Sequence, residues 1–230
     1  MTRLGDAAVA MWWNVDEAYR VEFHEWHSKE HLPERLSIPG FRRGTRWQDG
    51  THGAFFVLYE LSDYGVLTSA DYLARLNDPT PWSTKMMPLH RGMVRSQCRI
   101  LAASGEGVAR ILRTVRLSPR PGEADRLRRN LEELVASVPG QEGLTSAMLL
   151  HTETPDAEPT AEQKIRGRDG AADWIVVIGG HDRAALDRVA GESTEARLIE
   201  AGAQNIEFNR YDLVHGLTAL DMQRTVEEPA

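Results

Sequence analysis

An internal repeat constrains the fold of this chain more than any other feature. The segment Ser37–Gly40 (Ser-Ile-Pro-Gly) recurs as Ser137–Gly140 (Ser-Val-Pro-Gly), one hundred residues later. Both copies follow a helical pattern and precede a strand-like run. Self-similarity at a fixed spacing is typical of a duplicated structural unit, which predicts the same order of elements in both halves.

The first half has the pattern β-α-β-β-α-β. Apolar runs predict its strands, and Tyr19, Phe23 and Trp26 at helical spacing predict an apolar helix face. Pro33 is expected to end this helix or to kink it near His31. The predicted strands cover 8–13, 41–48, 54–61 and 93–102, and a second helix covers 69–76.

The second half has the same pattern. A helix is predicted at 122–137, with a leucine-rich face, and another at 182–201, where Asp182 is the expected N-cap. A short flexible linker, 104–107, separates the halves. The predicted strands of this half cover 110–117, 144–151, 174–178 and 205–214.

This order is that of the split βαβ, or ferredoxin-like, unit, which has helices on one face of a four-stranded antiparallel sheet. The bare face of each sheet must be covered. We therefore predict an α+β fold of two tandem ferredoxin-like units whose sheets pack into an intramolecular, pseudo-dimeric α+β barrel. The expected parts are a first unit at 1–103, a second unit at 108–217 and a flexible tail at 218–230.

The second unit carries an insertion, 152–171, between its two middle strands, rich in Pro, Glu and Gly. It is interpreted either as a mobile, solvated hairpin extension or as a lid or oligomerisation arm. The first interpretation is favoured, because polar insertions in surface loops cost little free energy.

Composition excludes several classes of protein. The formal net charge of −7 argues against a nucleic-acid partner, because phosphate binding favours a basic surface. The single cysteine, Cys98, precludes an internal disulfide and fits a reducing compartment. No apolar run approaches the roughly 20 residues that span a bilayer, and the first ten residues lack a signal-peptide pattern. We expect a cytoplasmic protein with no membrane partner, and unpaired sheet edges would allow a homo-oligomer.

Aromatic side chains concentrate in the first half, which holds all tryptophans except Trp174. A concave aromatic pocket with a few polar groups is the usual site for a small molecule. The alternative is that the first half only has a bulkier core. The expected pocket walls are Trp12, Trp13, Trp26 and Trp47.

Three histidines, His24, His27 and His31, follow one another at spacings of three and four residues. On a helix they share one face, which could serve a metal ion. The pattern is not HExxH, and a partly exposed polar face beside Trp26 is the favoured interpretation. His31 lies in the last turn before Pro33 and could instead act as an acid or base in a cleft.

The run from Trp26 to Leu36, followed by Ile38–Phe41, resembles the EthD-like branch of the dimeric α+β barrel superfamily. The shared pattern is an aromatic first helix that ends in His-x-Pro, and then Pro-Gly-Phe at the second strand. The second half keeps Pro139-Gly140 without the His-x-Pro step, so it looks like a degenerate duplicate.

The resemblance implies the fold strongly and the reaction weakly. It implies a pocket between sheet and helices, in relatives that include cofactor-free cyclases, dehydratases, lactone isomerases and haem-binding enzymes. Only His31 matches the pattern of a pocket residue. His27 stands where many relatives have Tyr.

Arginine and tyrosine side chains supply further candidates. Arg42 and Arg46 lie at alternating positions that share a strand face and could bind a carboxylate or phenolate. The slightly favoured alternative is a solvated face or salt bridges to Glu60 and Asp49. Tyr59 shares a face with apolar neighbours, and its hydroxyl could still reach a pocket.

The favoured function is a cofactor-independent lyase, dehydratase, cyclase or isomerase that acts on a small aromatic or cyclic molecule. Its catalytic candidates are His31, His27 and Tyr59. No cofactor is expected. The alternatives are a metal- or haem-dependent monooxygenase that uses His24, His27 or His31 as ligands, and a non-catalytic small-molecule-binding protein.

Overall fold

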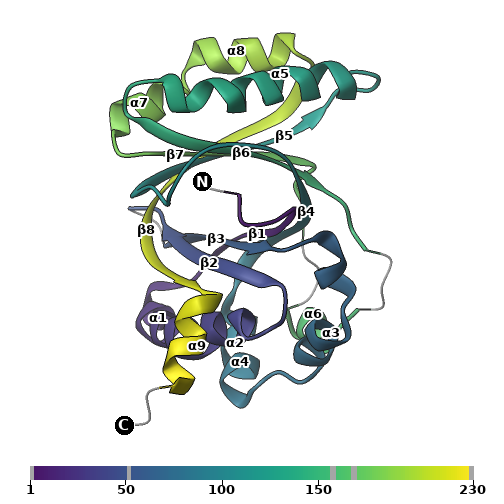
Figure 1. Ribbon diagram of the computed structural model, residues 1–230, viewed down its shortest axis with the longest axis vertical. Helices are drawn as coiled ribbons and strands as arrows, with labels where there is room; N and C mark the ends of the chain where they lie inside the picture. Colours follow the sequence, from purple (N-terminus) through teal and green to yellow (C-terminus); the bar gives the residue numbers. More distant parts are fainter. Residues whose placement is uncertain (1–2, 51–52, 156–158, 167–169, 228–230) are drawn as a thin grey trace. The chain divides into compact units, whose positions relative to one another are not determined.

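The computed structural model describes residues 3–50, 53–155, 159–166 and 170–227. Its contacts divide the chain into two compact units. The N-terminal unit comprises 4–98, 153–171 and 214–230, and the C-terminal unit comprises 99–152 and 172–213 together with the first three residues. Figure 1 shows the helices and strands of both units.

The N-terminal unit has three complete strands covered on one face by helices. The strands pair in the order β1-β3-β2, antiparallel throughout, and Trp13 lies opposite Phe55 in that register. The elements are β1 (Ala7–Asn14), α1 (Arg20–Trp26), α2 (Leu32–Leu36), β2 (Phe41–Gln48), β3 (Ala54–Leu61), α3 (Ala70–Asn77), α4 (Pro81–Met86), α6 (Ala161–Arg166) and α9 (Ala219–Glu227).

The C-terminal unit repeats this plan with antiparallel pairing in the order β5-β7-β6. Leu127 and Leu131 of its long helix are buried as the leucine-rich face predicts, and Val135 is buried beside them. The elements are β5 (Ile111–Pro119), α5 (Ala124–Ser137), β6 (Leu144–Thr152), β7 (Trp174–Gly180), α7 (Arg183–Arg188) and α8 (Glu192–Glu200).

Two long strands, β4 (Arg91–Gly105) and β8 (Ala203–Thr218), have residues in both units. With them, the eight strands form a closed antiparallel barrel in the order β1-β3-β2-β8-β5-β7-β6-β4. Both halves follow β-α-β-β-α-β, so the predicted α+β fold and barrel topology are confirmed. No helix of the described residues is long and apolar enough to span a membrane.

Strand alternation sets the core of the N-terminal unit. Met11 and Trp13 on β1 and Val57 and Tyr59 on β3 belong to the cluster that packs against the helices. Trp12 pairs instead with Phe56 on the opposite sheet face, at 4.9 Å between ring centroids. The helix-covered face therefore collects one set of aromatic side chains, and the other face collects a second set.

Two segments differ from the prediction. The expected flexible tail, 218–230, contains the helix α9, and Met222 packs against the core of the N-terminal unit. The insertion groups with the N-terminal unit rather than with the strands that it connects. Residues 228–230 of the tail and 156–158 and 167–169 of the insertion lie outside the described part of the chain.

Candidate functional site

The helix that carries the histidines widens into a π-helical turn, η2, at His27–His31. The backbone N–H of Leu32 donates to the carbonyl of His27, five residues earlier. Proline has no N–H to donate and would crowd the carbonyl of the preceding turn, so a wider turn before Pro33 relieves both problems. Helical structure continues to Leu36, so the expected end of the helix near His31 is wrong, and the irregularity near His31 is this wider turn.

Imidazole and indole rings stack against one another beneath this turn. The ring centroids of Trp26 and His31 are 4.5 Å apart, and those of Trp13 and His90 are 4.8 Å apart. The His27 ring lies between them, 5.6 Å from that of His31 and 6.3 Å from that of Trp13. Three histidines are thus built into an aromatic core.

The three histidines of the predicted metal face do not converge. His24 packs against Phe55, with ring centroids 5.4 Å apart, while His27 and His31 point into the aromatic stack. Within the ranges that the structure describes, no group of three or more His, Cys, Asp or Glu side chains is placed to hold a metal ion.

Burial keeps these imidazoles neutral. It lowers the pKa of His27 and His31 well below the ordinary value, and the charges of Arg46 and Arg35 add to the shift. It lowers the pKa of His90 to about 3. Both ring nitrogens of His27 and of His90 lack a hydrogen-bond partner among the described residues, and each such atom costs about 1–3 kcal/mol.

A small cavity of about 30 Å³ lies beside His31. The volume admits one water or a molecule of that size. The buried Tyr59 hydroxyl has no partner in the described structure, and burial raises its pKa. The residues that line the cavity are Val9, Met11, His31, Arg35, Phe41, Tyr59, Tyr72, Leu76, Arg95, Glu162 and Arg166.

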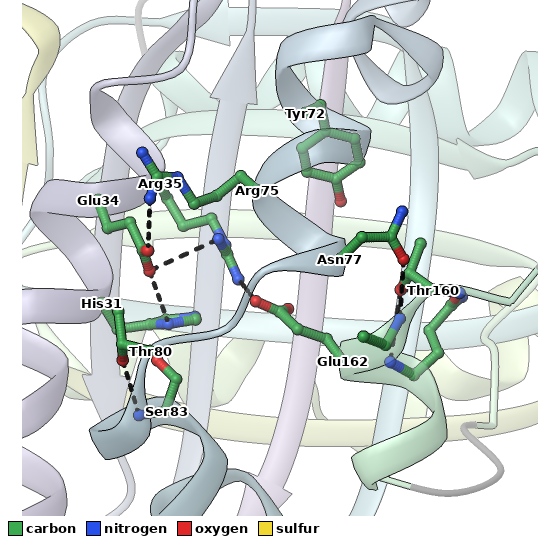
Figure 2. A network of polar contacts seen from close by, with 12 residues as sticks. His31, Glu34, Arg35, Tyr72, Arg75, Asn77, Thr80, Ser83, Thr160 and Glu162 are labelled. Atoms are coloured by element: carbon green, nitrogen blue, oxygen red, sulfur yellow. Dashed lines mark hydrogen bonds and ion pairs between the residues drawn. The ribbon is translucent and has the colours of Figure 1, made fainter.

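A network of charged side chains includes the cavity residues Arg35 and Glu162 (Figure 2). Arg35 is 4% exposed and forms an ion pair with Glu162. Its Nη1 lies 3.7 Å from Oε2 of Glu34, whose other oxygen is 3.1 Å from Nη1 of Arg75. The same Oε2 is 3.9 Å from Nδ1 of His31, so a protonated His31 would face a carboxylate.

The pKa shifts of this network follow from burial and pairing. Burial acts to lower the pKa of Arg35, but the Glu162 carboxylate together with Tyr59 and Tyr72 outweighs it, and the pKa is raised. Burial raises the pKa of Glu34 and outweighs the opposing effects of Arg35 and Arg75. The site therefore combines a fixed cation with a carboxyl group that gains protons more readily than usual.

The insertion supplies part of this site. Glu162 on α6 is 2% exposed and also accepts a hydrogen bond from Arg166, at 3.3 Å. The Asn77 side chain accepts a hydrogen bond from the backbone N–H of Ala161 at 3.0 Å. The favoured interpretation of a mobile, solvated extension is therefore wrong for α6, because its acidic side chain is buried against α2.

A larger pocket of about 400 Å³ lies beside the insertion and shares Arg95 with the small cavity. Nη2 of Arg95 donates to the Tyr72 hydroxyl at 2.6 Å. The pocket is within the usual size range for small-molecule sites, about 300–1,000 Å³. The residues that line it are Arg95, Gln97, Thr154, Pro159, Gln163, Lys164, Gly170 and Ala171.

The two candidate arginines have separate environments. A register shift between Phe41 and Arg43 interrupts the alternation of β2, and Arg42 is exposed. Arg46 is 2% exposed and donates from Nη2 to the Ser28 hydroxyl at 2.9 Å, with its guanidinium 5.6 Å from the centre of the Phe23 ring. Burial lowers the pKa of Arg46 to about 10. The predicted shared face is wrong.

The four candidate tryptophans also divide between the two sheet faces. Trp13 and Trp26 belong to the helix-facing cluster with the histidines. Trp12 packs on Phe56, and the indole of Trp47 donates to the Thr45 hydroxyl at 2.9 Å. Of the four, Trp26 contacts His31 of the cavity directly, and Trp13 is linked to His31 only through the ring of His27.

Sequence reasoning missed several residues of the site: Glu34, Arg35, His90, Arg95 and Glu162. Glu34 and Arg35 follow His31 by three and four residues, so helical spacing could have suggested that they share its surroundings. The insertion gave no such signal, since a glutamate in a polar segment is ordinarily solvated.

No protein-family profile matches this sequence, and no curated protein is similar to it at a significant level. Solved structures do share its fold. An anthrone oxidase-like protein is similar over 93% of this chain and 93% of its own, with a TM-score of 0.62 and 12% identity. A candidate monooxygenase from Fusobacterium nucleatum is similar over 94% of this chain and 95% of its own, with a TM-score of 0.60 and 7% identity.

A haem-binding protein from Thermus thermophilus is similar over 98% of this chain and 96% of its own, with a TM-score of 0.51 and 9% identity. At these identities the likeness establishes the fold alone. The chain has the ferredoxin-like, dimeric α+β barrel fold.

Proposed function

We propose that this chain is an enzyme that oxidises a small organic molecule beside His31 in the N-terminal unit, with His31 as the acid–base residue, and that the cavity of about 30 Å³ opens to admit the substrate. The observation that carries the proposal is the pairing of a neutral, buried imidazole with a small cavity that an unpartnered tyrosine hydroxyl also lines. The names of the anthrone oxidase-like and candidate monooxygenase structures support oxidation over other proton-transfer chemistry.

The chemistry can be written for a substrate with an acidic CH₂ group. Nδ1 of His31 accepts a proton from that carbon, and the nearby Glu34 carboxylate stabilises the imidazolium that forms. The electrons left on carbon reduce dioxygen. The balanced reaction converts CH₂ and O₂ into C=O and H₂O, so the substrate supplies all four electrons and no external reductant is needed.

Haem binding is the second candidate, on the name of the Thermus thermophilus structure. Buried imidazoles such as His27 and His90 are chemically suitable axial ligands. Both rings, however, pack in the aromatic stack with Trp13, and neither His27 nor His90 lines the cavity beside His31. The residues present therefore do not fit a haem in this conformation, and no step is assigned to one.

A lyase or isomerase reaction, which the EthD-like resemblance implies, is another form of the same proposal. Either reaction would use His31 for proton transfer, and neither would consume dioxygen. Oxygen uptake therefore separates an oxidase from a lyase or isomerase that uses the same residue.

The test measures oxygen consumption with anthrone as the probe, using the full chain. We expect uptake by the wild-type protein, and a loss of about 100-fold or more for His31→Ala, the range for removal of an acid–base group. His181→Ala, which changes an exposed histidine of the C-terminal unit, is the control and should retain full activity. Equal activity of His31→Ala and the wild type would exclude the role of His31.

Haem is tested separately by adding hemin and recording the absorption spectrum. We expect no shifted Soret band with the wild-type protein. A stoichiometric band that His27→Ala or His90→Ala removes would support the haem candidate instead.

A further inference from the structure

The inserted helix α6 packs against the N-terminal unit through charge rather than through an apolar face. Its most buried side chain is Glu162, and Arg166 follows one turn later. The only large apolar side chain of the helix, Ile165, is half-buried. A six-residue helix is marginal by itself, so its position depends on these contacts.

A buried ion pair is a weak way to fix a helix. Both charges lose their hydration, and well-packed apolar residues of similar volume would hold the helix at least as well. The carboxylate of Glu162 nevertheless forms an ion pair with Arg35, a buried guanidinium that could bind another anion. Nη1 of Arg35 is buried and makes no hydrogen bond among the described residues, so the guanidinium has capacity for another acceptor.

The surroundings of Glu162 favour an anion over a neutral molecule. Among the described residues, the small cavity is lined by the cations Arg35, Arg95 and Arg166 and by one acidic side chain, Glu162. The adjoining 400 Å³ pocket is lined by Arg95 and Lys164 and, among the described residues, by no acidic side chain. This basic region stands out in a chain whose net charge is −7.

We propose that the ligand of this site is a small organic carboxylate that binds Arg35 in place of Glu162, with its body in the pocket lined by Arg95 and Lys164. Glu162 is then an internal stand-in for the carboxylate, and the insertion selects for acidic ligands. Ligand binding releases α6, which enlarges a cavity that is too small for an organic molecule. This inference rests on the proposed function only for the location of the site.

The first test is calorimetric binding of benzoate, with benzamide as a neutral molecule of the same shape. We expect the wild-type protein to bind benzoate and to bind benzamide much more weakly. Glu162→Gln should bind benzoate about tenfold more tightly than the wild type, because the internal competitor loses its charge. Glu132→Gln, which breaks an exposed ion pair with Arg128 on α5, is the matched control and should leave affinity unchanged.

The second test uses hydrogen exchange of the wild-type protein and needs no variant. Saturating benzoate should speed the exchange of amides 161–166, while benzamide should not. Unchanged or weaker benzoate binding by a folded Glu162→Gln, or slower exchange of α6 with benzoate, would overturn the proposal.

The two proposals fail separately. Tighter binding of benzoate by Glu162→Gln without any oxygen uptake would leave the carboxylate site standing and remove the oxidase. Oxygen uptake that depends on His31, with no effect of Glu162→Gln on benzoate affinity, would do the reverse.

Discussion

The two units share one order of elements and differ in what fills the space between sheet and helices. In the C-terminal unit this space is mainly aliphatic, with Leu127, Leu131 and Val176 among its buried residues. In the N-terminal unit the same space holds Trp13 and Trp26 and the buried imidazoles that stack on them. One fold therefore supports both a plain apolar core and a core with ionisable groups.

This difference separates the core residues that the fold requires from the polar groups that it does not require. A buried polar atom without a partner costs about 1–3 kcal/mol, and the N-terminal core holds such atoms on His27, His90 and Tyr59. The C-terminal unit shows that the β-α-β-β-α-β plan packs without buried histidines. The polar groups of the N-terminal core are therefore best explained by the site, not by folding.

The largest effect on stability should come from Trp26→Ala. Trp26 is fully buried, and its indole donates to the Ser83 hydroxyl at 3.2 Å, so truncation leaves a cavity and costs about 3–5 kcal/mol of unfolding free energy. Trp174→Ala, in the C-terminal unit, should cost less, because Trp174 packs on the partly exposed His151. Urea denaturation measures both losses. A larger loss for Trp174→Ala would contradict the expectation that Trp26 contributes more to the unfolding free energy.

The second effect is a loss of stability in acid that the N-terminal unit alone should show. His90 has a folded pKa of about 3 against an ordinary value of 6.5, so below pH 6.5 the unfolded chain binds a proton that the folded chain does not. The unfolding free energy should fall by about 2 kcal/mol between pH 7 and pH 5 from His90 alone. His27 and His31 add to it in the same direction.

Urea midpoints at the two pH values test this. His90→Phe should lose about 2 kcal/mol of the pH dependence, while His181→Ala, an exposed histidine of the C-terminal unit, should keep all of it. Equal stability of the wild type at pH 7 and pH 5 would show that the imidazoles are not buried in the neutral form.

The smallest effect is a gain. Tyr59→Phe removes a buried hydroxyl that has no partner in the described structure, and it should raise the unfolding free energy by about 1 kcal/mol. The same variant should not affect the C-terminal core. A loss of stability would instead show that the hydroxyl is hydrogen-bonded in solution, for example to a water in the cavity.

Much of the fold followed from periodicity. The strands at 41–48 and 54–61 match β2 and β3, and Leu127 and Leu131 are buried as their spacing predicts. Predictions about the local backbone at single residues were less reliable. Pro33 did not end its helix, because a π-helical turn absorbs the missing hydrogen bond, and a register shift on β2 separated Arg42 from Arg46.

The site was only partly predictable for a related reason. His31 and Tyr59, which the sequence singled out, line the same cavity, and Trp26 stacks on His31. Trp12 and Trp47 were assigned to the same pocket, but strand alternation places them on the other sheet face.

By itself, the sequence determined the order of elements and the half of the chain that carries most of the aromatic and imidazole side chains. Hydrophobic periodicity is a local property, and it survives without knowledge of distant contacts. Only the tertiary structure joined Arg35 to Glu162, 127 residues away, and turned a polar insertion into part of the site. That pairing depends on burial, because the same two charges in water would interact weakly and leave no trace in a pattern of residues.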